Sequence, residues 1–554
     1  MKQKIFALFL ILCGLCLNLK AETQGDVVGR VLDDSGAPLA GATVQILHSK
    51  GGVITDENGY FRIPYSKDGA VRVKVSFVGY QTQTFVLKAD ERKGEQHVLR
   101  LQPDATALDQ VVVTATRTPK ALKDAPVVTR LITANDIKIA DATNVQDLLT
   151  EQMPGLEFGY AMNQETSLNM NGFGGNAVLF LVDGERLAGE TMDNVDYSRL
   201  NLDNVGRIEI VKGAASALYG ANAVAGVINI ISRENSEPWT ANVNTRYNNF
   251  NKEWRHGGSF SFNAGKWNSQ TSIQRTTSDE VQLTSPFDTE SNILHIYGGE
   301  TFNVKERLTY KLSDKVKLIG RGGYFARVSN RGNYDDHYKD YSAGLKTVMN
   351  LSENDNLEIS YGIDQYDKAR YVNDVRTHDH DYTNRQNTVR ALYSHIFGKN
   401  TLTAGADFLN DFLTTYQFAN NGSKTQNSYD AFAQFDYNPL QWMNIVASLR
   451  HDYFSASSQH ATTGRLALMT KWKGFSIRAN YAGGFRAPTL KEMYMNFDMA
   501  GMQMIYGNPD LKPEKSNNFN LALEHTGRVK NAGFLTGQYS LTLMGYYNKY
   551  DKRI

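Results

Sequence analysis

The stretch Met443-Asn-Ile-Val-Ala-Ser-Leu-Arg450 decides the fold, because apolar and polar side chains alternate along it. Ser448 and Arg450 fall on one face. The apolar residues that share the opposite face are Met443, Ile445, Ala447 and Leu449. Successive side chains of a strand point to opposite sides, so the stretch predicts a strand with one apolar and one polar face. Such strands are typical of a membrane barrel, whose apolar face meets lipid and whose polar face lines a wet lumen.

The alternation recurs from Thr240 onward in segments of about ten residues, and we count about 15 antiparallel strands over 235–554. Short breaks, such as Ala264-Gly-Lys266 and Asn438-Pro439, alternate with long polar breaks. The long breaks lie near 279–300, 328–341, 367–385, 416–425, 455–464 and 486–515. Short turns at one end and long loops at the other favour a membrane barrel over a soluble β-sandwich of the same period.

The composition excludes two classes of protein. The 554 residues include 59 Lys and Arg against 58 Asp and Glu, which gives a net charge of +1. A nucleic-acid-binding protein would need a basic excess, and an acidic disordered tail would need an acidic one. We therefore expect no nucleic acid among the partners. The 46 glycines, 29 tyrosines and 26 phenylalanines favour strands and turns.

The first residues are typical of a secretory signal peptide over 1–21. Two lysines precede an apolar run over 5–17, and we expect cleavage near Ala21. The run is too short for a membrane anchor. The chain's two cysteines, Cys13 and Cys16, lie within it. The mature chain is therefore expected to hold no disulfide and no thiolate metal site.

Short alternating stretches between Gly and Asp turns predict a small β-sandwich over 25–103. Three segments of it resemble the carboxypeptidase-regulatory-like domain: Ala37-Pro-Leu-Ala-Gly-Ala-Thr-Val44, Thr55-Asp-Glu-Asn-Gly-Tyr-Phe61 and Phe77-Val-Gly-Tyr80. This resemblance implies a fold and no peptidase activity.

A mixed α/β segment is predicted over 119–234. It contains two motifs, Arg207-Ile-Glu-Ile-Val-Lys-Gly213 and Leu218-Tyr-Gly-Ala-Asn-Ala-Val-Ala-Gly-Val-Ile-Asn-Ile230. Both resemble the plug domain of TonB-dependent outer-membrane receptors. The expected fold is thus mainly β, with an N-terminal β-sandwich, an α/β plug and an antiparallel transmembrane β-barrel in the outer membrane of the cell.

The same resemblance places the TonB box, a segment that pairs with the periplasmic protein TonB as an added strand, at 109–118. Its expected contact residues are Asp109, Gln110, Val111, Val112, Val113, Thr114 and Ala115. TonB, with ExbB and ExbD, would supply the energy. A regulatory-like domain ahead of the box is an arrangement familiar from Bacteroidetes receptors.

The family's barrels have roughly 22 strands, so we expect this sequence to be truncated by about seven C-terminal strands. It also ends in Tyr550-Asp-Lys-Arg-Ile554, without the terminal aromatic residue of an outer-membrane barrel.

Enzyme motifs, such as His-Glu-x-x-His, Gly-x-Ser-x-Gly and a phosphate-binding glycine loop, are absent from the sequence. Two boxes instead mark a predicted external loop: Phe485, Arg486, Ala487 and Pro488, and Asn508, Pro509, Asp510 and Leu511. They resemble a pair found in haem-uptake receptors, and related pairs occur in cobalamin and siderophore receptors. They are therefore expected to bind the ligand.

Between the boxes, twelve residues contain five of the 14 methionines. We expect Tyr494, Met495, Met499 and Met502 to contact the ligand, because thioether and aromatic groups suit a flat apolar macrocycle and sulfur can ligate haem iron. Packing of these side chains against the barrel rim is the alternative. The loop departs from the haem-receptor pattern in having no histidine.

Histidines occur in other predicted external loops, notably His337, His378 and His380. The His-Asp-His stretch at 378–380 could bind a metal or a metal chelate, and a solvated loop tip is the alternative.

The sequence thus predicts an active transporter of the outer membrane, without an intrinsic cofactor, that imports a scarce metal chelate. Haem is the first candidate ligand, and a siderophore or cobalamin is the alternative. A non-transporting adhesin or binding receptor on the same scaffold is the alternative of another class. Outer-membrane lipids and a surface lipoprotein are further expected partners.

Overall fold

The structure is a computed structural model that describes residues 25–33, 36, 38–39, 41–47, 52–56, 58–65, 71–77, 82–87, 97–101, 111–142, 144–160, 164–189, 194–235, 237–284, 293–499, 501–532 and 535–551. The predicted signal peptide, and Asp109 and Gln110 of the predicted TonB box, lie outside these residues. The chain divides into two compact units, Met1–Gln110 and Val111–Ile554.

The first unit consists of two small sheets around one apolar core. One sheet has the order β4-β1-β7 and the other β3-β2-β5-β6. The bounds are β1 (Gly25–Leu32), β2 (Thr43–Ile46), β3 (Gly52–Ile54), β4 (Tyr60–Tyr65), β5 (Val71–Ser76), β6 (Gln83–Leu87) and β7 (His97–Arg100). Buried side chains alternate with exposed ones along β5, and residues of both sheets share the core. The predicted β-sandwich is confirmed.

The second unit begins with a plug built on a five-stranded sheet of order β10-β16-β17-β14-β15. Its strands are β10 (Thr129–Thr133), β14 (Val178–Val182), β15 (Glu185–Arg186), β16 (Val205–Lys212) and β17 (Gly226–Ser232). A second sheet contains β11 (Leu156–Tyr160), β12 (Thr166–Met170) and β13 (Phe173–Gly174), and a short pair contains β8 (Val111–Val112) and β9 (Lys120–Ala121).

Helices complete the plug: η2 (Leu122–Asp124), α3 (Ala134–Ala140), α4 (Val145–Gln152), η3 (Gly175–Ala177), η4 (Tyr197–Arg199) and α5 (Ser216–Tyr219). The α4 helix begins at an Asn144 cap and buries Val145, Leu148 and Leu149 in the plug core. None of the described helices is long and apolar enough to cross a membrane.

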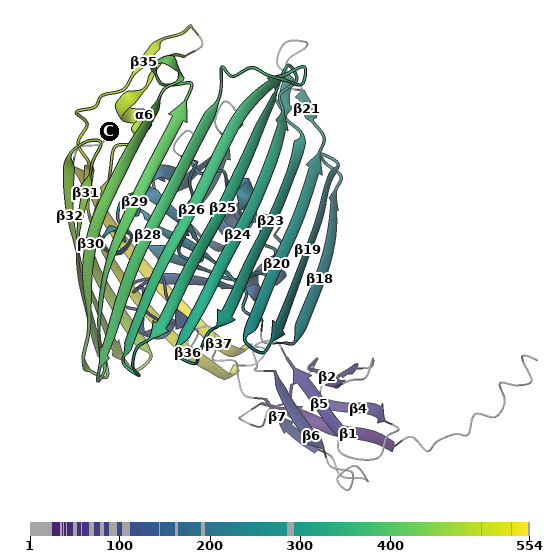
Figure 1. Ribbon diagram of the computed structural model, residues 1–554. Coiled ribbons are helices and arrows are strands. Elements are labelled where there is room, and N and C mark those ends of the chain that lie inside the picture. The colour runs from purple at the N-terminus through teal and green to yellow at the C-terminus, as the bar shows by residue number, and fades with distance from the viewer. Residues whose placement is uncertain are drawn as a thin grey trace, which may run out of the picture. The chain divides into compact units, whose positions relative to one another are not determined.

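The rest of the second unit is one large antiparallel sheet that curves around the plug (Figure 1). Its consecutive strands are β18 (Trp239–Asn248), β19 (Glu253–Ala264), β20 (Trp267–Ser278), β23 (Gly299–Lys311), β24 (Val316–Asn330), β25 (Asp335–Asn350), β26 (Asp355–Val372), β28 (Tyr382–Phe397), β29 (Asn400–Thr415), β30 (Ser423–Leu440), β31 (Met443–Phe454), β32 (Gln459–Trp472), β33 (Phe475–Arg486), β36 (Glu514–Ala532) and β37 (Leu535–Asp551). The short β27 (Val375–Arg376) pairs with β26.

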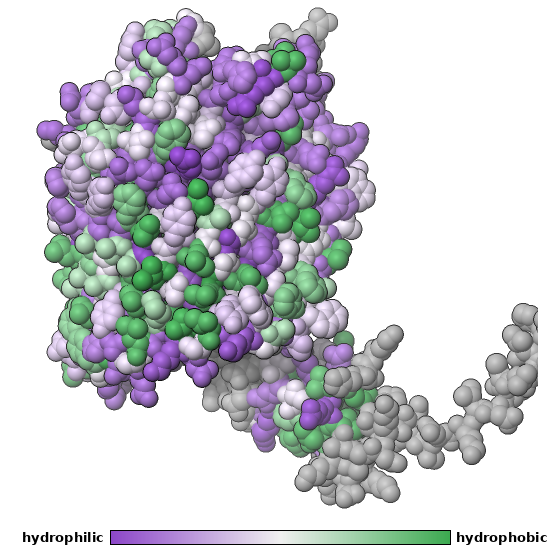
Figure 2. All heavy atoms as spheres, in the orientation of Figure 1, coloured by the Kyte–Doolittle hydropathy of each residue, from purple (hydrophilic) through white to green (hydrophobic). Residues whose placement is uncertain are grey.

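The two faces of this sheet differ as the alternation predicts. Leu449, Leu466 and Leu521 expose more than half of their surface on the outer face, whereas Ser448 and Arg450 are buried toward the plug. Figure 2 shows hydrophobic side chains gathered over the lower half of the wall and hydrophilic ones at its upper end. The predicted antiparallel barrel with an apolar exterior is confirmed.

The long connections between the described strands lie at one end of the barrel, the loop end, whereas the described connections at the other end, the turn end, are short. Connections at 279–298, 373–381, 416–422 and 487–513 lie at the loop end and carry β21 (Val281–Thr284), β22 (Ile293–Ile296), η5 (Ala419–Asn421), α6 (Leu490–Tyr494), β34 (Asn496–Asp498) and β35 (Met504–Tyr506). The predicted loop at 328–341 was too long. The β24 strand continues to Asn330, and β25 already begins at Asp335.

Candidate ligand-binding and energy-coupling sites

The first box closes the base of the loop 487–513. Phe485 is buried, with its ring 5.8 Å from that of Phe454 in a T-shaped contact. Arg486 donates from Nη1 to Glu492 Oε2 at 2.9 Å and from Nη2 to Glu514 Oε1 at 3.0 Å. Both side chains are thus engaged within the protein, and Ala487 is buried beside Phe485.

The α6 helix follows directly and is held by a reciprocal cap. The Glu492 amide donates to Thr489 Oγ1 at 3.2 Å, and the Thr489 amide donates to Glu492 Oε2 at 2.8 Å. The carboxylate of Glu492 therefore both pairs with Arg486 and caps the start of α6.

The second box returns the chain to the same helix. The Asn508 amide donates to the Glu492 carbonyl at 2.9 Å, and Asn508 Oδ1 accepts from the Asp510 amide at 3.0 Å. The Leu511 amide donates to the Asn508 carbonyl at 3.3 Å, and Pro509 and Asp510 are exposed. The structure thus brings the two predicted boxes together at Glu492.

The methionines between the boxes divide into two groups. Met493 is fully buried, in a cluster with Leu490 and Phe418. The hairpin of β34 and β35, which we call the methionine hairpin (496–506), exposes the larger side chains of Met499 (41%), Met502 (72%), Met504 (47%) and Tyr506 (69%).

Tyr494 and Met495 connect α6 to the hairpin and are partly buried. The ammonium group of Lys424 lies 4.5 Å from the Tyr494 ring centre, and Met495 forms a backbone bridge with Phe418. Of the four predicted contact residues between the boxes, Met499 and Met502 are thus the more accessible.

A polar cavity of about 110 Å³ lies beneath α6. Ala487 and Pro488 of the first box line it together with Arg186 and Asn222 of the plug. The wall contributes polar side chains: Asn384, Gln386, Asp411, Gln426 and Ser428. A small polar or charged part of a ligand could bind in this cavity.

The three histidines that the sequence singled out each have a nearby partner. His378 Nδ1 lies 2.8 Å from Asp381 Oδ2, and His380 Nε2 lies 2.8 Å from Arg370 Nη1. The ring centres of His337 and Tyr371 lie 4.2 Å apart, with the two rings tilted by 36°. Within the described ranges, no three His, Cys, Asp or Glu side chains are grouped as a metal site would need.

The described part of the predicted TonB box lies inside the plug. Val112, Thr114 and Ala115 are buried, Val113 is partly buried and Val111 is half exposed. The C-terminal part of the predicted box contacts the barrel wall, where the Thr116 carbonyl accepts from Gln434 Nε2 at 2.7 Å and the Ala115 carbonyl accepts from Arg465 Nη1 at 3.3 Å.

Arg117 fixes the same segment electrostatically. Its guanidinium lies 4.4 Å from the Tyr219 ring centre and 3.7 Å from Asp407. Burial, aided by Arg390, lowers the pKa of Arg117 to about 10, although Asp407 opposes the shift. Arg117 therefore remains charged at neutral pH and pairs with the wall.

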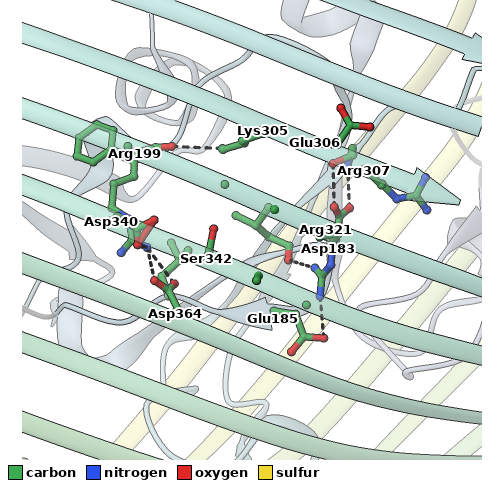
Figure 3. A pocket seen from close by; sticks show the side chains of 18 of the residues that line it. Asp183, Glu185, Arg199, Lys305, Glu306, Arg307, Arg321, Asp340, Ser342 and Asp364 are labelled. Atoms are coloured by element: carbon green, nitrogen blue, oxygen red, sulfur yellow. Dashed lines mark hydrogen bonds and ion pairs between the residues drawn. The ribbon is translucent and has the colours of Figure 1, made fainter.

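A second, larger cavity lies between the plug and the wall (Figure 3). It encloses about 140 Å³ and is lined by charged residues of both parts. Arg199 of the plug pairs with Asp364 at 2.8 Å and with Asp340, while Arg321 of the wall pairs with Glu185 at 3.1 Å. Lys305 points toward the Arg199 carbonyl, 3.3 Å away.

Glu209, which contacts the TonB box directly, was not identified from the sequence. Glu209 lies in the motif that marked the plug, and its carboxylate accepts hydrogen bonds from Val113 and Thr114. A charged residue within the otherwise apolar stretch Ile208-Glu-Ile-Val211 was the available signal, since a buried carboxylate needs partners.

Three family models match the chain. The model described as "TonB dependent receptor-like, beta-barrel" matches residues 194–554. The "TonB-dependent Receptor Plug Domain" matches 121–227, and the "CarboxypepD_reg-like domain" matches 27–113.

The chain is similar in sequence to a vitamin B12 transporter of Photobacterium profundum, with 26% identity over 81% of this chain and 71% of the relative. It is 25% identical to an iron-regulated outer membrane virulence protein of Vibrio cholerae, over 76% of this chain and 67% of the relative.

Two solved structures share the fold. The siderophore receptor PirA of Pseudomonas aeruginosa has a TM-score of 0.62 at 17% identity, over 76% of this chain and 74% of that one. The hemophore receptor HasR of Serratia marcescens, in complex with its hemophore and heme, has a TM-score of 0.63 at 13% identity, over 77% and 73% of the two chains.

Proposed function

The chain belongs to the TonB-dependent receptors of the outer membrane, which are transporters and not enzymes, and on that premise we propose that it imports a metal chelate, with haem as the first candidate. The observation that carries this proposal is the methionine hairpin, whose exposed thioethers lie at the loop end, between the two boxes in the sequence. The loop end would face the cell exterior.

The chemistry of the hairpin supports a flat apolar ligand. Met499, Met502, Met504 and Tyr506 each present part of a soft, polarizable or aromatic side chain to solvent. A thioether sulfur can also serve as an axial ligand of haem iron. Since the loop contains no histidine, Met499 or Met502 would supply that ligand.

The polar cavity under α6 favours a second candidate, a siderophore or cobalamin. Arg186, Asn384 and Asp411 offer donors and acceptors that suit amides or hydroxyls better than a porphyrin face. The names of the relatives include a B12 transporter and a siderophore receptor, so both ligand classes occur among similar proteins.

Import would draw its energy from TonB, with ExbB and ExbD in the inner membrane, through the described box residues 111–115. The sequence has no nucleotide-binding motif that could supply the energy instead. A TonB strand would pair with the box as an added strand and pull on the plug.

Haem titration into the full chain in detergent, followed at the Soret band, tests the ligand. We expect a saturable shift whose affinity falls about tenfold or more when Met499 and Met502 are replaced by Ala, because the soft contacts and the sulfur ligand are lost. Met443→Ala is the matched control, since Met443 lies at the turn end of β31.

Vitamin B12 and a ferric siderophore are tested in parallel by fluorescence quenching. Saturable binding of either, without a Soret shift, would replace haem as the ligand. An unchanged haem affinity in the double variant would contradict the role of the hairpin.

A further inference from the structure

One side chain of the plug binds two backbone amides and one hydroxyl of the TonB box. Glu209 of β16 is fully buried, and its Oε2 accepts three bonds: from the Val113 amide at 2.9 Å, the Thr114 amide at 2.8 Å and Thr114 Oγ1 at 2.7 Å. Its other oxygen accepts from Arg207 Nε at 2.7 Å. Hydrogen bonds to a carboxylate are roughly twice as strong as neutral ones.

The neighbours of Glu209 complete the attachment of Thr114. Asn229 lies opposite Glu209 in the β16–β17 ladder and donates from Nδ2 to Thr114 Oγ1 at 3.0 Å. The Tyr219 hydroxyl donates to the Thr114 carbonyl at 3.0 Å. Every polar group of Thr114 is therefore bonded within the plug.

These bonds compete with strand addition. A strand that pairs with the box needs free backbone amides, and those of Val113 and Thr114 are both taken by one carboxylate. Removing the box would in turn leave a buried carboxylate without three of its donors, which is unfavourable until water replaces them.

We propose that Glu209 is the positioning residue that holds the box strand folded in the plug, so that the strand becomes available only when the Glu209 bonds break. The inference rests on the proposed function in one respect, namely that 111–115 is the segment that TonB binds. The attachment itself follows from the plug's own contacts.

This attachment determines how accessible the TonB box is when neither ligand nor TonB is bound. Weakening the Glu209 bonds should raise the fraction of molecules with a released box, without ligand and without TonB. A residue that only stabilised the plug as a whole would also expose positions far from the box.

Maleimide labelling of a cysteine at Val112 tests the proposal on the full chain in detergent. Val112 is fully buried, and the chain's two cysteines lie in the predicted signal peptide. We expect labelling of V112C to accelerate about tenfold or more with Glu209→Ala, and less with Glu209→Gln or Thr114→Val.

Asp183→Asn is the matched control. Asp183 is a plug carboxylate that accepts from the Ser232 amide at 2.9 Å and from its hydroxyl at 2.8 Å, with no bond to the box. It should leave V112C labelling unchanged. A cysteine at Ile210, buried in the same strand as Glu209, should stay protected in all variants.

Labelling of V112C at the parent rate in Glu209→Gln and Thr114→Val would overturn the proposal, whether or not Glu209→Ala folds. Equal acceleration at Ile210 would overturn it too, because it would show general loosening. Capture of a TonB C-terminal fragment is measured separately. If the box is released but the fragment never binds, the TonB assignment fails and the Glu209 attachment stands.

Discussion

Arg486 shows that a residue in a ligand-receptor motif can have a structural task. Its guanidinium joins Glu492, at the start of α6, to Glu514, at the start of β36, so it ties both ends of the loop 487–513 together. Arg486 is 3% exposed. The first box therefore holds the loop 487–513 in place, and in the proposed function the ligand contacts come from the hairpin that this loop carries.

Replacing Arg486 with Ala should loosen this loop. Breaking a buried ion pair by removing one partner costs about 3–5 kcal/mol, and Arg486→Ala removes the guanidinium that bonds the buried Glu514 carboxylate. We expect much faster protease cleavage within 487–513 and an intact barrel band on gels. Arg385→Ala, at an exposed position, should leave the cleavage rate at the parent value, and equal rates in the two variants would contradict this role.

The hairpin of β11 and β12 anchors the loop-end side of the plug. Glu165, just before β12, pairs with Arg327 at 3.2 Å and Arg331 at 3.0 Å, and accepts from the Tyr338 hydroxyl at 2.8 Å. Burial alone would raise the pKa of Glu165, but Arg327, the Tyr338 bond, Lys368 and Arg331 outweigh it and hold that pKa below its ordinary 4.5.

This anchor should therefore weaken in acid. A carboxylate whose pKa is lower in the folded state stabilises the fold above its unfolded-state pKa, and that contribution is lost as the pH falls through the folded-state value. We expect amide exchange in β12, corrected for the intrinsic rate, to accelerate below pH 4.5. In the Glu165→Gln variant, the pH dependence should be lost and the β12 amides should exchange faster at neutral pH than in the parent. A pH profile of the variant parallel to that of the parent would contradict the role of Glu165 as an anchor.

The one-turn helix α5 links the two candidate sites. Ser216 Oγ accepts from the Phe485 amide of the first ligand box at 3.4 Å. Three residues later, the Tyr219 hydroxyl donates to the Thr114 carbonyl of the TonB box. Arg450 of the wall donates to the Leu218 carbonyl at 3.4 Å. The α5 helix thus connects the first ligand box (485–488) to the TonB box, which Glu209 holds.

Strand elements were predictable because alternation fixes which face meets lipid. Loop lengths were less predictable, since the strand ends that face the lumen are as polar as loops. Asp336, for example, lies on β25 and pairs with Lys368 at 3.3 Å and Arg370 at 3.2 Å on β26. The pairing of Glu209 with Thr114 could not be predicted, because it joins positions 95 residues apart whose register only the folded plug defines.

Across the molecule, buried charge joins the plug to the wall. Arg117 with Asp407, Arg199 with Asp364 and Arg321 with Glu185 link segments far apart in the chain. The cavity in Figure 3 is lined in part by such groups. Passage of a ligand would require these pairs to rearrange, which is work that a pull on the box could supply.

Uptake of radiolabelled haem iron by cells that express the full chain, or the same chain lacking 111–114, tests TonB-driven import most directly. We expect both chains to bind haem at the cell surface with the same affinity and only the full chain to accumulate iron inside the cell. Accumulation by the deletion variant at the parental rate would contradict TonB-driven import.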